Sequence, residues 1–233
     1  MHPRHVIAIL LIPLLAAGCL GRGGHHTTTT TNATTVGTTT AGEQMQLTVF
    51  AMRSGQLQAL AVQVPKTEAT AAASLKALGI DAGVTIADGT AKVDFPDATT
   101  QQAAEIVYTL TQYSTVQHVD VGARTGLTRA DIDPSYLPQI SVESPGVSAS
   151  VPKTFHVTGT AQVFEATFVV ELKIANRVAV KQTVTASEGA PNRGTFDVAI
   201  TSPASGAAEI VAYEPSAENG QPLHTVRVPI TVQ

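Results

Sequence analysis

The sequence predicts two domains, an α+β domain followed by an all-β sandwich, behind an N-terminal leader and a polar tract. In residues 44–133, stretches of alternating apolar residues are mixed with stretches of helical spacing, whereas from residue 139 onward the apolar residues alternate with a period of two. Short groups of Gly, Pro, Asn and Ser separate the segments of the second part, as in antiparallel sandwiches. Pro134 and Pro138 stiffen the connection, so we expect a junction at 134–138 and a sandwich at 139–233.

Residues 1–18 have the layout of a secretion signal. Arg4 precedes an apolar run, Val6–Leu15, and small residues precede Cys19. The run is shorter than the roughly 20 apolar residues that a membrane-spanning helix needs. The pattern resembles a bacterial lipobox, which implies cleavage before Cys19 and a diacylglycerol on its thiol. Cys19 is the single cysteine of the chain, which favours lipidation over an ordinary secretory signal with a chance cysteine.

Residues 19–43 predict a lipidated, Thr-rich disordered tether. They contain glycines and a threonine tract but no apolar period, so they offer too little apolar surface to offset the entropy of ordering. Such tracts can be O-glycosylated, a point that the sequence leaves open. His25 and His26 are adjacent and could bind a metal ion, but an incidental pair is the favoured interpretation.

The first half of the α+β domain predicts a hairpin and a helix. Residues 46–52 and 57–64 read as strands around a turn that contains Gly55. Thr67 is the expected helix N-cap, and Glu68 would follow in the first turn, where the helix dipole favours a carboxylate.

The second half predicts another hairpin, a helix and a closing strand. Asp88–Gly89 supplies the positive φ angles of a type I′ turn between strands at 84–87 and 90–95. Thr99 or Thr100 is expected to cap the second helix, and alternation predicts a last strand at 116–121. The expected order is therefore β-β-α-β-β-α-β.

Residues 44–133 resemble the GerMN domain of GerM-type sporulation and germination lipoproteins. The resemblance implies a fold similar to the ring-building motif of secretion assemblies. One departure is the segment between Gly79 and Val84, which is shorter than the corresponding loop of many family members. The matching segments are Leu47–Val64, Asp88–Phe95, Ile106–Thr111 and Val116–Gly122.

The C-terminal part predicts about seven short strands and no helix. Its apolar residues alternate with polar ones, as in an immunoglobulin-like sandwich, but it lacks the tryptophan and the cysteine pair of antibody domains. The expected strands contain residues 140–142, 155–157, 168–174, 178–184, 196–200, 210–213 and 226–232.

Residues 139–233 resemble the Gmad-type immunoglobulin-like domain of bacterial spore-germination proteins. The order of the two resemblances behind a lipobox makes the pairing more specific than either alone. Neither resemblance brings catalytic residues with it. The segments that carry the second one are Ser144–Gly146, Val157–Glu165, Gly194–Phe196, Ala212–Ser216, Asn219–Gly220 and Val226–Val232.

The sequence predicts no catalytic residue, cofactor or metal site. It contains no G-x-S-x-G, H-E-x-x-H, P-loop or dinucleotide-binding motif. His118, His156 and His224 lie in expected strands, where the alternation turns them toward solvent. Glu165 and Glu214 could form an exposed recognition pair, although binding of backbone groups or exposure to water is the favoured interpretation.

Composition and resemblance together predict a non-catalytic binding or assembly protein of the bacterial cell envelope. With 14% charged residues and a net charge of −4, the chain is no electrostatic match for nucleic acid. We expect an extracytoplasmic protein that is anchored to the membrane by lipid and is related to sporulation and germination lipoproteins. Its partner would be an envelope protein or a second copy, contacted through edge strands.

Two alternatives remain open from the sequence. The first is a hydrolase that acts on the cell wall, or its accessory subunit, because paired carboxylates are not visible in a sequence. The absence of tryptophan platforms for sugars speaks against it. The second is a solute-binding lipoprotein, which usually needs two large α/β lobes around a cleft.

Overall fold

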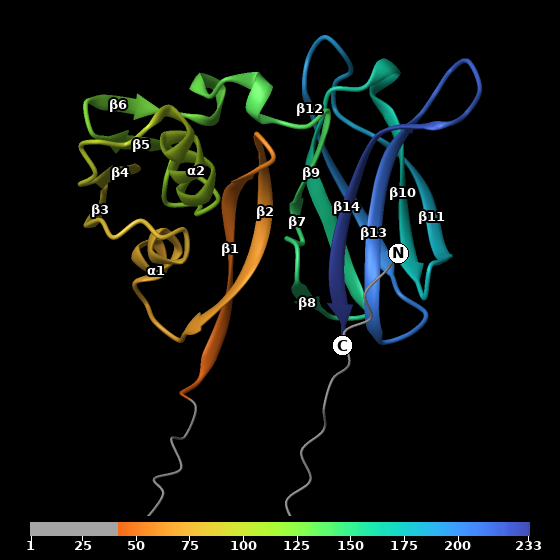
Figure 1. The fold of residues 1–233 in the computed structure, drawn as a ribbon, viewed down its shortest axis with the longest axis horizontal. Helices are drawn as coiled ribbons and strands as arrows, with labels where there is room; N and C mark the ends of the chain where they lie inside the picture. Colours follow the sequence, from red (N-terminus) through yellow and green to blue (C-terminus); the bar gives the residue numbers. More distant parts are fainter. Residues whose placement is uncertain (1–41) are drawn as a thin grey trace, which may run out of the picture. The chain divides into compact units, whose positions relative to one another are not determined.

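The computed structural model describes residues 42–233, which fold into two hydrophobic cores. The predicted signal, Cys19 and most of the predicted tether lie outside the described residues. The expected fold class, α+β followed by a β-sandwich, is confirmed (Figure 1).

The first domain surrounds two helices with two sheets. Strands β1 (Gln44–Arg53) and β2 (Gln56–Pro65) form an antiparallel hairpin. A separate four-stranded sheet has the order β3-β4-β5-β6, with β4 and β5 parallel. Helix α2 contacts both β1 and β5. The remaining elements are α1 (Thr70–Ala77), β3 (Val84–Ala87), β4 (Thr90–Val93), α2 (Thr100–Leu110), β5 (His118–Val121) and β6 (Arg124–Leu127).

The predicted order of elements is confirmed, with one strand added. Strand β6 has no buried residue and therefore no apolar alternation that would reveal it in the sequence. The predicted type I′ turn is confirmed, because Asp88 and Gly89 both have positive φ. Ser54 and Gly55 form a turn of the same kind between β1 and β2.

The expected N-cap residue is found at the start of α2 but not at the start of α1. Thr99 caps α2, since its side chain accepts from the Gln102 N–H and the Gln102 side chain accepts from the Thr99 N–H. The prediction of Thr67 as the cap of α1 is wrong, as is that of Glu68 in the first turn. The Thr67 hydroxyl accepts from the Ala69 N–H. This bond stabilises the turn before α1 and does not cap the N-terminus of the helix.

The second domain is a sandwich of two sheets. One sheet has the order β12-β9-β7 and the other the order β11-β10-β13-β14-β8. The chain crosses between the sheets at residues 145–148, and β8 then pairs in parallel with the end of β14. The strands are β7 (Ile140–Ser144), β8 (Ala149–Val151), β9 (Thr154–Ala161), β10 (Thr167–Ile174), β11 (Arg177–Thr185), β12 (Gly194–Thr201), β13 (Gly206–Pro215) and β14 (Pro222–Val232).

The sandwich has eight strands, where about seven were expected. The additional strand, β8, is only three residues long, too short for a pattern in the sequence. The core contains an edge-to-face pair, Phe168 and Phe196, with ring centroids 4.9 Å apart. Gly159 lets β7 and β9 approach closely, because a Cβ there would lie 1.9 Å from the Ser141 carbonyl oxygen.

Two short 3₁₀ turns connect the domains, η1 (Arg129–Asp131) and η2 (Pro134–Tyr136). Asp133 caps the second turn by accepting from the Ser135 N–H at 2.9 Å. No helix within residues 42–233 is long and apolar enough to cross a membrane.

Candidate functional site

The β1–β2 hairpin has one edge covered by α2. Two side chains of the helix, and that of Gln112 just beyond its end, bind backbone groups of β1. The Met52 N–H donates to Glu105 at 2.6 Å, the Phe50 N–H donates to Thr109 at 2.9 Å, and the Gln112 amide donates to the Thr48 carbonyl at 2.8 Å. Because these groups would otherwise be unpaired at an edge, the helix protects β1 as a neighbouring strand would.

The other edge of the hairpin joins the second domain. The Ala61 N–H donates to the Val147 carbonyl, and the Val147 N–H donates to the Ala59 carbonyl, both at 2.8 Å. Val147 lies at the crossing between the two sandwich sheets. The preceding Gly146 is pressed against β2, since a Cβ there would lie 2.9 Å from the Ala61 nitrogen. The absence of a side chain at residue 146 therefore permits this contact.

A partly buried ion pair forms a second link between the domains. Arg129 of η1 lies 2.5 Å from the Glu143 carboxylate of β7, and the two side chains are 31% and 15% exposed. The same guanidinium lies 4.6 Å from the centre of the Tyr108 ring and donates to Thr111 at 2.9 Å. Burial, with the nearby charge of Glu143, raises the pKa of the Tyr108 hydroxyl, which stays neutral.

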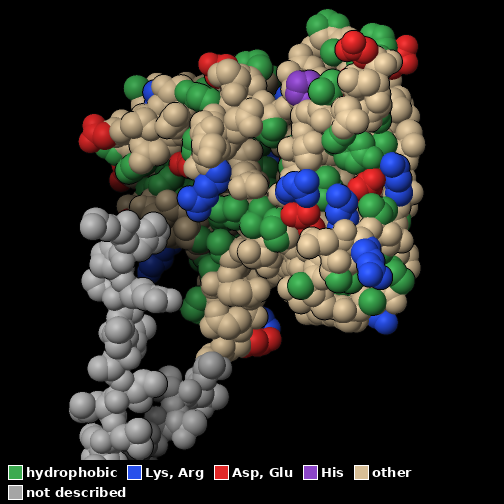
Figure 2. Space-filling model, turned by 45° about the vertical axis from the view of Figure 1, so that its right-hand side comes forward, with side chains coloured by type: hydrophobic (Ala, Val, Ile, Leu, Met, Phe, Trp, Pro, Cys, Tyr) green, Lys and Arg blue, Asp and Glu red, His purple; other side chains and the backbone are tan. Residues whose placement is uncertain are grey.

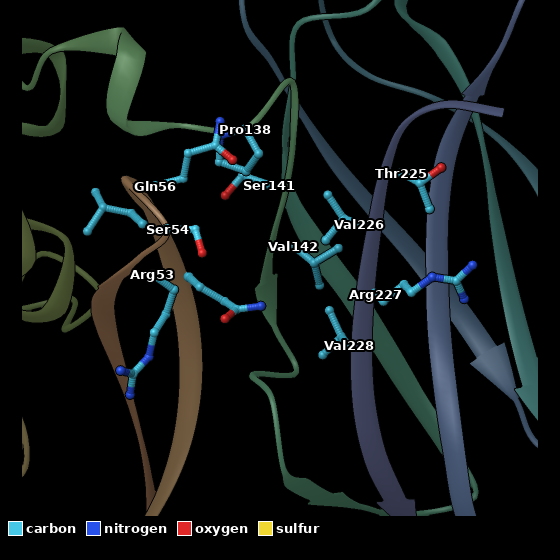
Figure 3. A pocket seen from close by; sticks show the side chains of 12 residues that line it. Arg53, Ser54, Gln56, Pro138, Ser141, Val142, Thr225, Val226, Arg227 and Val228 are labelled. Carbon is cyan, nitrogen blue, oxygen red and sulfur yellow. The ribbon is translucent and has the colours of Figure 1, made fainter. Parts of the chain in front are cut away.

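Between the two domains lies a groove of about 270 Å³ with walls from both of them (Figure 3). The turn and the start of β2 form one wall, and β7 and β14 form the other. In Figure 3, the side chains of Thr225 and Arg227 point away from Val142. The lining residues are Arg53, Ser54, Gln56, Leu57, Gln58, Pro138, Ser141, Val142, Thr225, Val226, Arg227 and Val228.

Strand β14 has a free edge at this groove. One edge of β14 pairs with β13. On the other edge, β8 is the only neighbour among the strands of residues 42–233, and β8 pairs only with Ile230–Val232. The Ser148 N–H donates to the Pro229 carbonyl, so Pro229 faces this edge. Successive residues of a strand direct their backbone groups to opposite edges. Arg227 is two residues before Pro229, so its N–H and C=O point to the same free edge. This edge can accept an added strand.

The structure places the three histidines at exposed positions, as expected. His118 lies at the start of β5. The His156 ring lies 2.5 Å from Asp197, with both side chains more than 60% exposed. The His224 ring lies 3.7 Å from Glu214. None of them lines the groove between the domains.

The two glutamates of the Gmad-like segments lie near one another in the fold. Glu214 accepts from the Phe164 N–H at 2.8 Å, so its carboxylate binds a backbone group, as the favoured interpretation held. Glu165, the residue after Phe164, is exposed, and its backbone has a positive φ of 53°. The contact joins the β9–β10 loop to the end of β13.

Cys19, His25 and His26 lie outside the described residues, so what the sequence suggests for them stays a prediction. Within residues 42–233, no group of three or more His, Cys, Asp or Glu side chains is arranged to hold a metal ion. The residues that sequence reasoning missed are Arg129, Glu143 and Gly146, which join the domains. Of these, only Gly146 lies in a segment that the resemblance had marked.

The sequence of the sandwich is similar to that of a known family of domains. Residues 139–221 match the Gmad2 family, described as the immunoglobulin-like domain of bacterial spore germination. This stretch of the second domain is therefore similar to the Gmad2 family. The resemblance seen in the sequence of this part of the chain is thereby confirmed. No curated protein sequence matches the chain.

One solved structure similar to this chain contains the tandem GerMN domains of the sporulation protein GerM from Bacillus subtilis. The two are 15% identical, with a TM-score of 0.35, and the match covers 82% of this chain. The chain spans 61% of the length of that structure. A likeness at this level assigns no family to the first domain. Its GerMN-like character stays a prediction from its residues.

Proposed function

We propose that this chain is a non-catalytic binding or assembly protein of the bacterial cell envelope, anchored outside the cytoplasm by a lipid on Cys19. The Gmad2 match supports a relation to sporulation or germination. The lipobox-like leader supports the anchor and the location. The proposed partner is an envelope protein that this chain contacts without making or breaking bonds.

The observation that carries the proposal is the free edge of β14 beside a groove with walls from both domains. An extended segment of the partner would pair with the Arg227 N–H and C=O and contact Val142 and Val226 in the groove. Strand addition takes its affinity from main-chain hydrogen bonds and its specificity from the neighbouring side chains. The links at Arg129 and Gly146 hold the two walls together before the partner arrives.

The test is photo-crosslinking in intact cells from a photoreactive residue at Gln56, an exposed position in the groove wall. Arg227→Pro removes the N–H at the free edge, where proline is tolerated. Arg227→Ala keeps that N–H and removes the ion pair with Glu209. We expect a crosslinked envelope protein that is lost with Arg227→Pro and retained with Arg227→Ala.

Equal crosslinking in the two variants would exclude strand addition at β14. Thermal unfolding of both purified variants controls for folding. If both lose the crosslink and remain folded, the side chain and not the backbone edge makes the contact, and the proposed mode of binding is wrong.

The anchor is tested separately by replacing Cys19 with Ala and fractionating the cells. We expect the protein to leave the membrane fraction, because the acyl chains contribute about 0.8 kcal/mol for each buried CH₂ group. A variant that stays membrane-bound would show that something else holds the protein there.

The hydrolase alternative has its own test. Purified protein is incubated with cell-wall fragments, and no cleavage is expected. Cleavage that a single carboxylate substitution abolishes would overturn the non-catalytic proposal.

A further inference from the structure

One end of the sandwich combines exposed apolar side chains with strained backbone. Phe164 is 64% exposed and Leu223 is 44% exposed. Glu165, Ala166 and His224 have φ angles of 53°, 58° and 50°, in the left-handed region that non-glycine residues rarely adopt.

Contacts among three loops hold this strained backbone in place. The Phe164 N–H donates to Glu214, which pairs with Leu223 in the β13–β14 ladder. The Ala190 N–H donates to the Val163 carbonyl at 2.9 Å, and the Ala186 N–H donates to the Ala166 carbonyl at 2.8 Å. Thus the β9–β10, β11–β12 and β13–β14 loops form one surface.

We call this surface the loop-end patch and define it by Phe164, Glu165, Glu188, Glu214, Leu223 and His224. It lies at the end of the sandwich opposite to Val232. The chain enters the described part near that other end, because Gln46 accepts from the Ser150 N–H, and Ser150 in turn contacts Gln233. In immunoglobulin-like sandwiches, the corresponding loops at one end form the binding surface of variable domains.

The charge of the patch is one-sided. Its loops and strand ends carry Glu165, Glu188, Glu214 and Glu218. The arginine among them, Arg193, donates to the Pro138 carbonyl and to Thr160 and is half buried. Figure 2 shows acidic and hydrophobic side chains together at this end, with lysines and arginines lower on the visible face.

We propose that the loop-end patch is a second binding surface, for a partner polypeptide that presents apolar side chains flanked by lysine or arginine. Phe164 is the central anchor, since exposed aromatic residues in rigid settings dominate the energy of interfaces. The acidic rim selects a basic partner and disfavours an anionic membrane or a nucleic acid. The strain fits this role, because residues held in rare backbone conformations are concentrated at functional sites.

The proposal is tested with a random peptide library displayed on phage and panned against the immobilised full chain. We expect the enriched peptides to combine apolar residues with lysine or arginine and to bind more weakly as the salt concentration rises. Phe164→Ser should weaken the best peptide about ten-fold or more. Glu188→Lys should weaken it too, because it reverses a charge of the rim.

Val178→Ser is the matched control. Val178 is 49% exposed on β11, outside the patch, so this variant removes a similar exposed apolar side chain and should leave binding unchanged. Since Phe164 and Glu188 are exposed, both variants should unfold at the temperature of the parent protein. Arg227→Pro should also leave peptide binding unchanged, which separates this surface from the proposed groove.

Three results of the peptide experiment would overturn the proposal. They are enrichment of acidic peptides, equal binding by the parent and Phe164→Ser, and the enrichment of no peptide at all. Self-association of the chain that Phe164→Ser abolishes would likewise overturn it, because the patch would then contact a second copy.

Discussion

At the scale of single residues, the Arg129–Glu143 pair links the two domains. It joins η1 to β7 while the guanidinium packs on the Tyr108 ring. The second carboxylate oxygen of Glu143 is buried and has no hydrogen-bond partner among the described residues. Because water reaches the Glu143 carboxylate poorly, its negative charge is balanced by Arg129.

We predict that Arg129 and Glu143 are energetically coupled. In a double-mutant cycle with Arg129→Met and Glu143→Gln, the coupling free energy should be about 1–3 kcal/mol, as for hydrogen bonds to charged groups. Chemical denaturation of the four proteins measures it. Additive effects of the two substitutions would mean that the pair contributes no link between the domains.

Glu171 is a second residue whose charge matters to the sandwich. Its carboxylate, 7% exposed, accepts from the Tyr213 hydroxyl at 2.9 Å and lies 3.3 Å from Lys181. Burial acts to raise the pKa of Glu171, but these contacts outweigh it and hold the pKa below its ordinary value of 4.5.

Stability should therefore fall in acid. A lowered pKa in the folded state stabilises the fold above the ordinary pKa, and this contribution disappears as the pH falls through the folded-state pKa. Thermal unfolding at neutral pH and at pH values below 4.5 measures this loss of stability. We predict that the loss is smaller for Glu171→Gln than for the parent. Glu68→Gln, at an exposed position, is the control, and identical pH profiles for the parent and Glu171→Gln would contradict the assignment.

At the scale of elements, α2 acts as an edge cover for β1. We predict that Thr109→Val, which keeps the shape but removes the acceptor of the Phe50 N–H, lowers the free energy of unfolding by about 1–3 kcal/mol. Thr115→Val, at an exposed position, should change it little. Denaturant titration compares them, and equal stabilities would show that the Phe50 N–H finds another partner.

The same element shows what could be predicted from the sequence. The apolar spacing and the Thr99 cap predicted α2, and the Asp88–Gly89 turn predicted the β3–β4 hairpin, because these signals are local. The helix–strand bonds of Glu105 and Thr109 could not be predicted, since their partners are more than 50 residues away. Strands β6 and β8 escaped prediction because they are short and carry no clear alternation.

At the scale of the whole molecule, the candidate site depends on contacts between the two domains. The Pro-rich junction indicated a stiff connection, but the groove arises from β2, β7 and β14, which only the folded chain brings together. Gly146 stood within a resembling segment, yet its role as a point of close approach to β2 has no sequence signal. The exposed Phe164 was likewise indistinguishable from a core phenylalanine in a strand pattern.

We expect both domains to form one body, with the groove as a preformed surface between them. Scanning calorimetry of the parent, Gly146→Ala and Gly83→Ala measures whether they unfold as one body. A Cβ at residue 146 would meet β2 backbone at 2.9 Å, whereas one at residue 83 meets nothing within 4 Å.

We predict one cooperative transition for the parent and for Gly83→Ala. Gly146→Ala should lose about 1–3 kcal/mol through overpacking and unfold at a lower temperature or in two separate steps. Two independent transitions in the parent, unchanged by Gly146→Ala, would contradict the claim and leave the groove without its second wall.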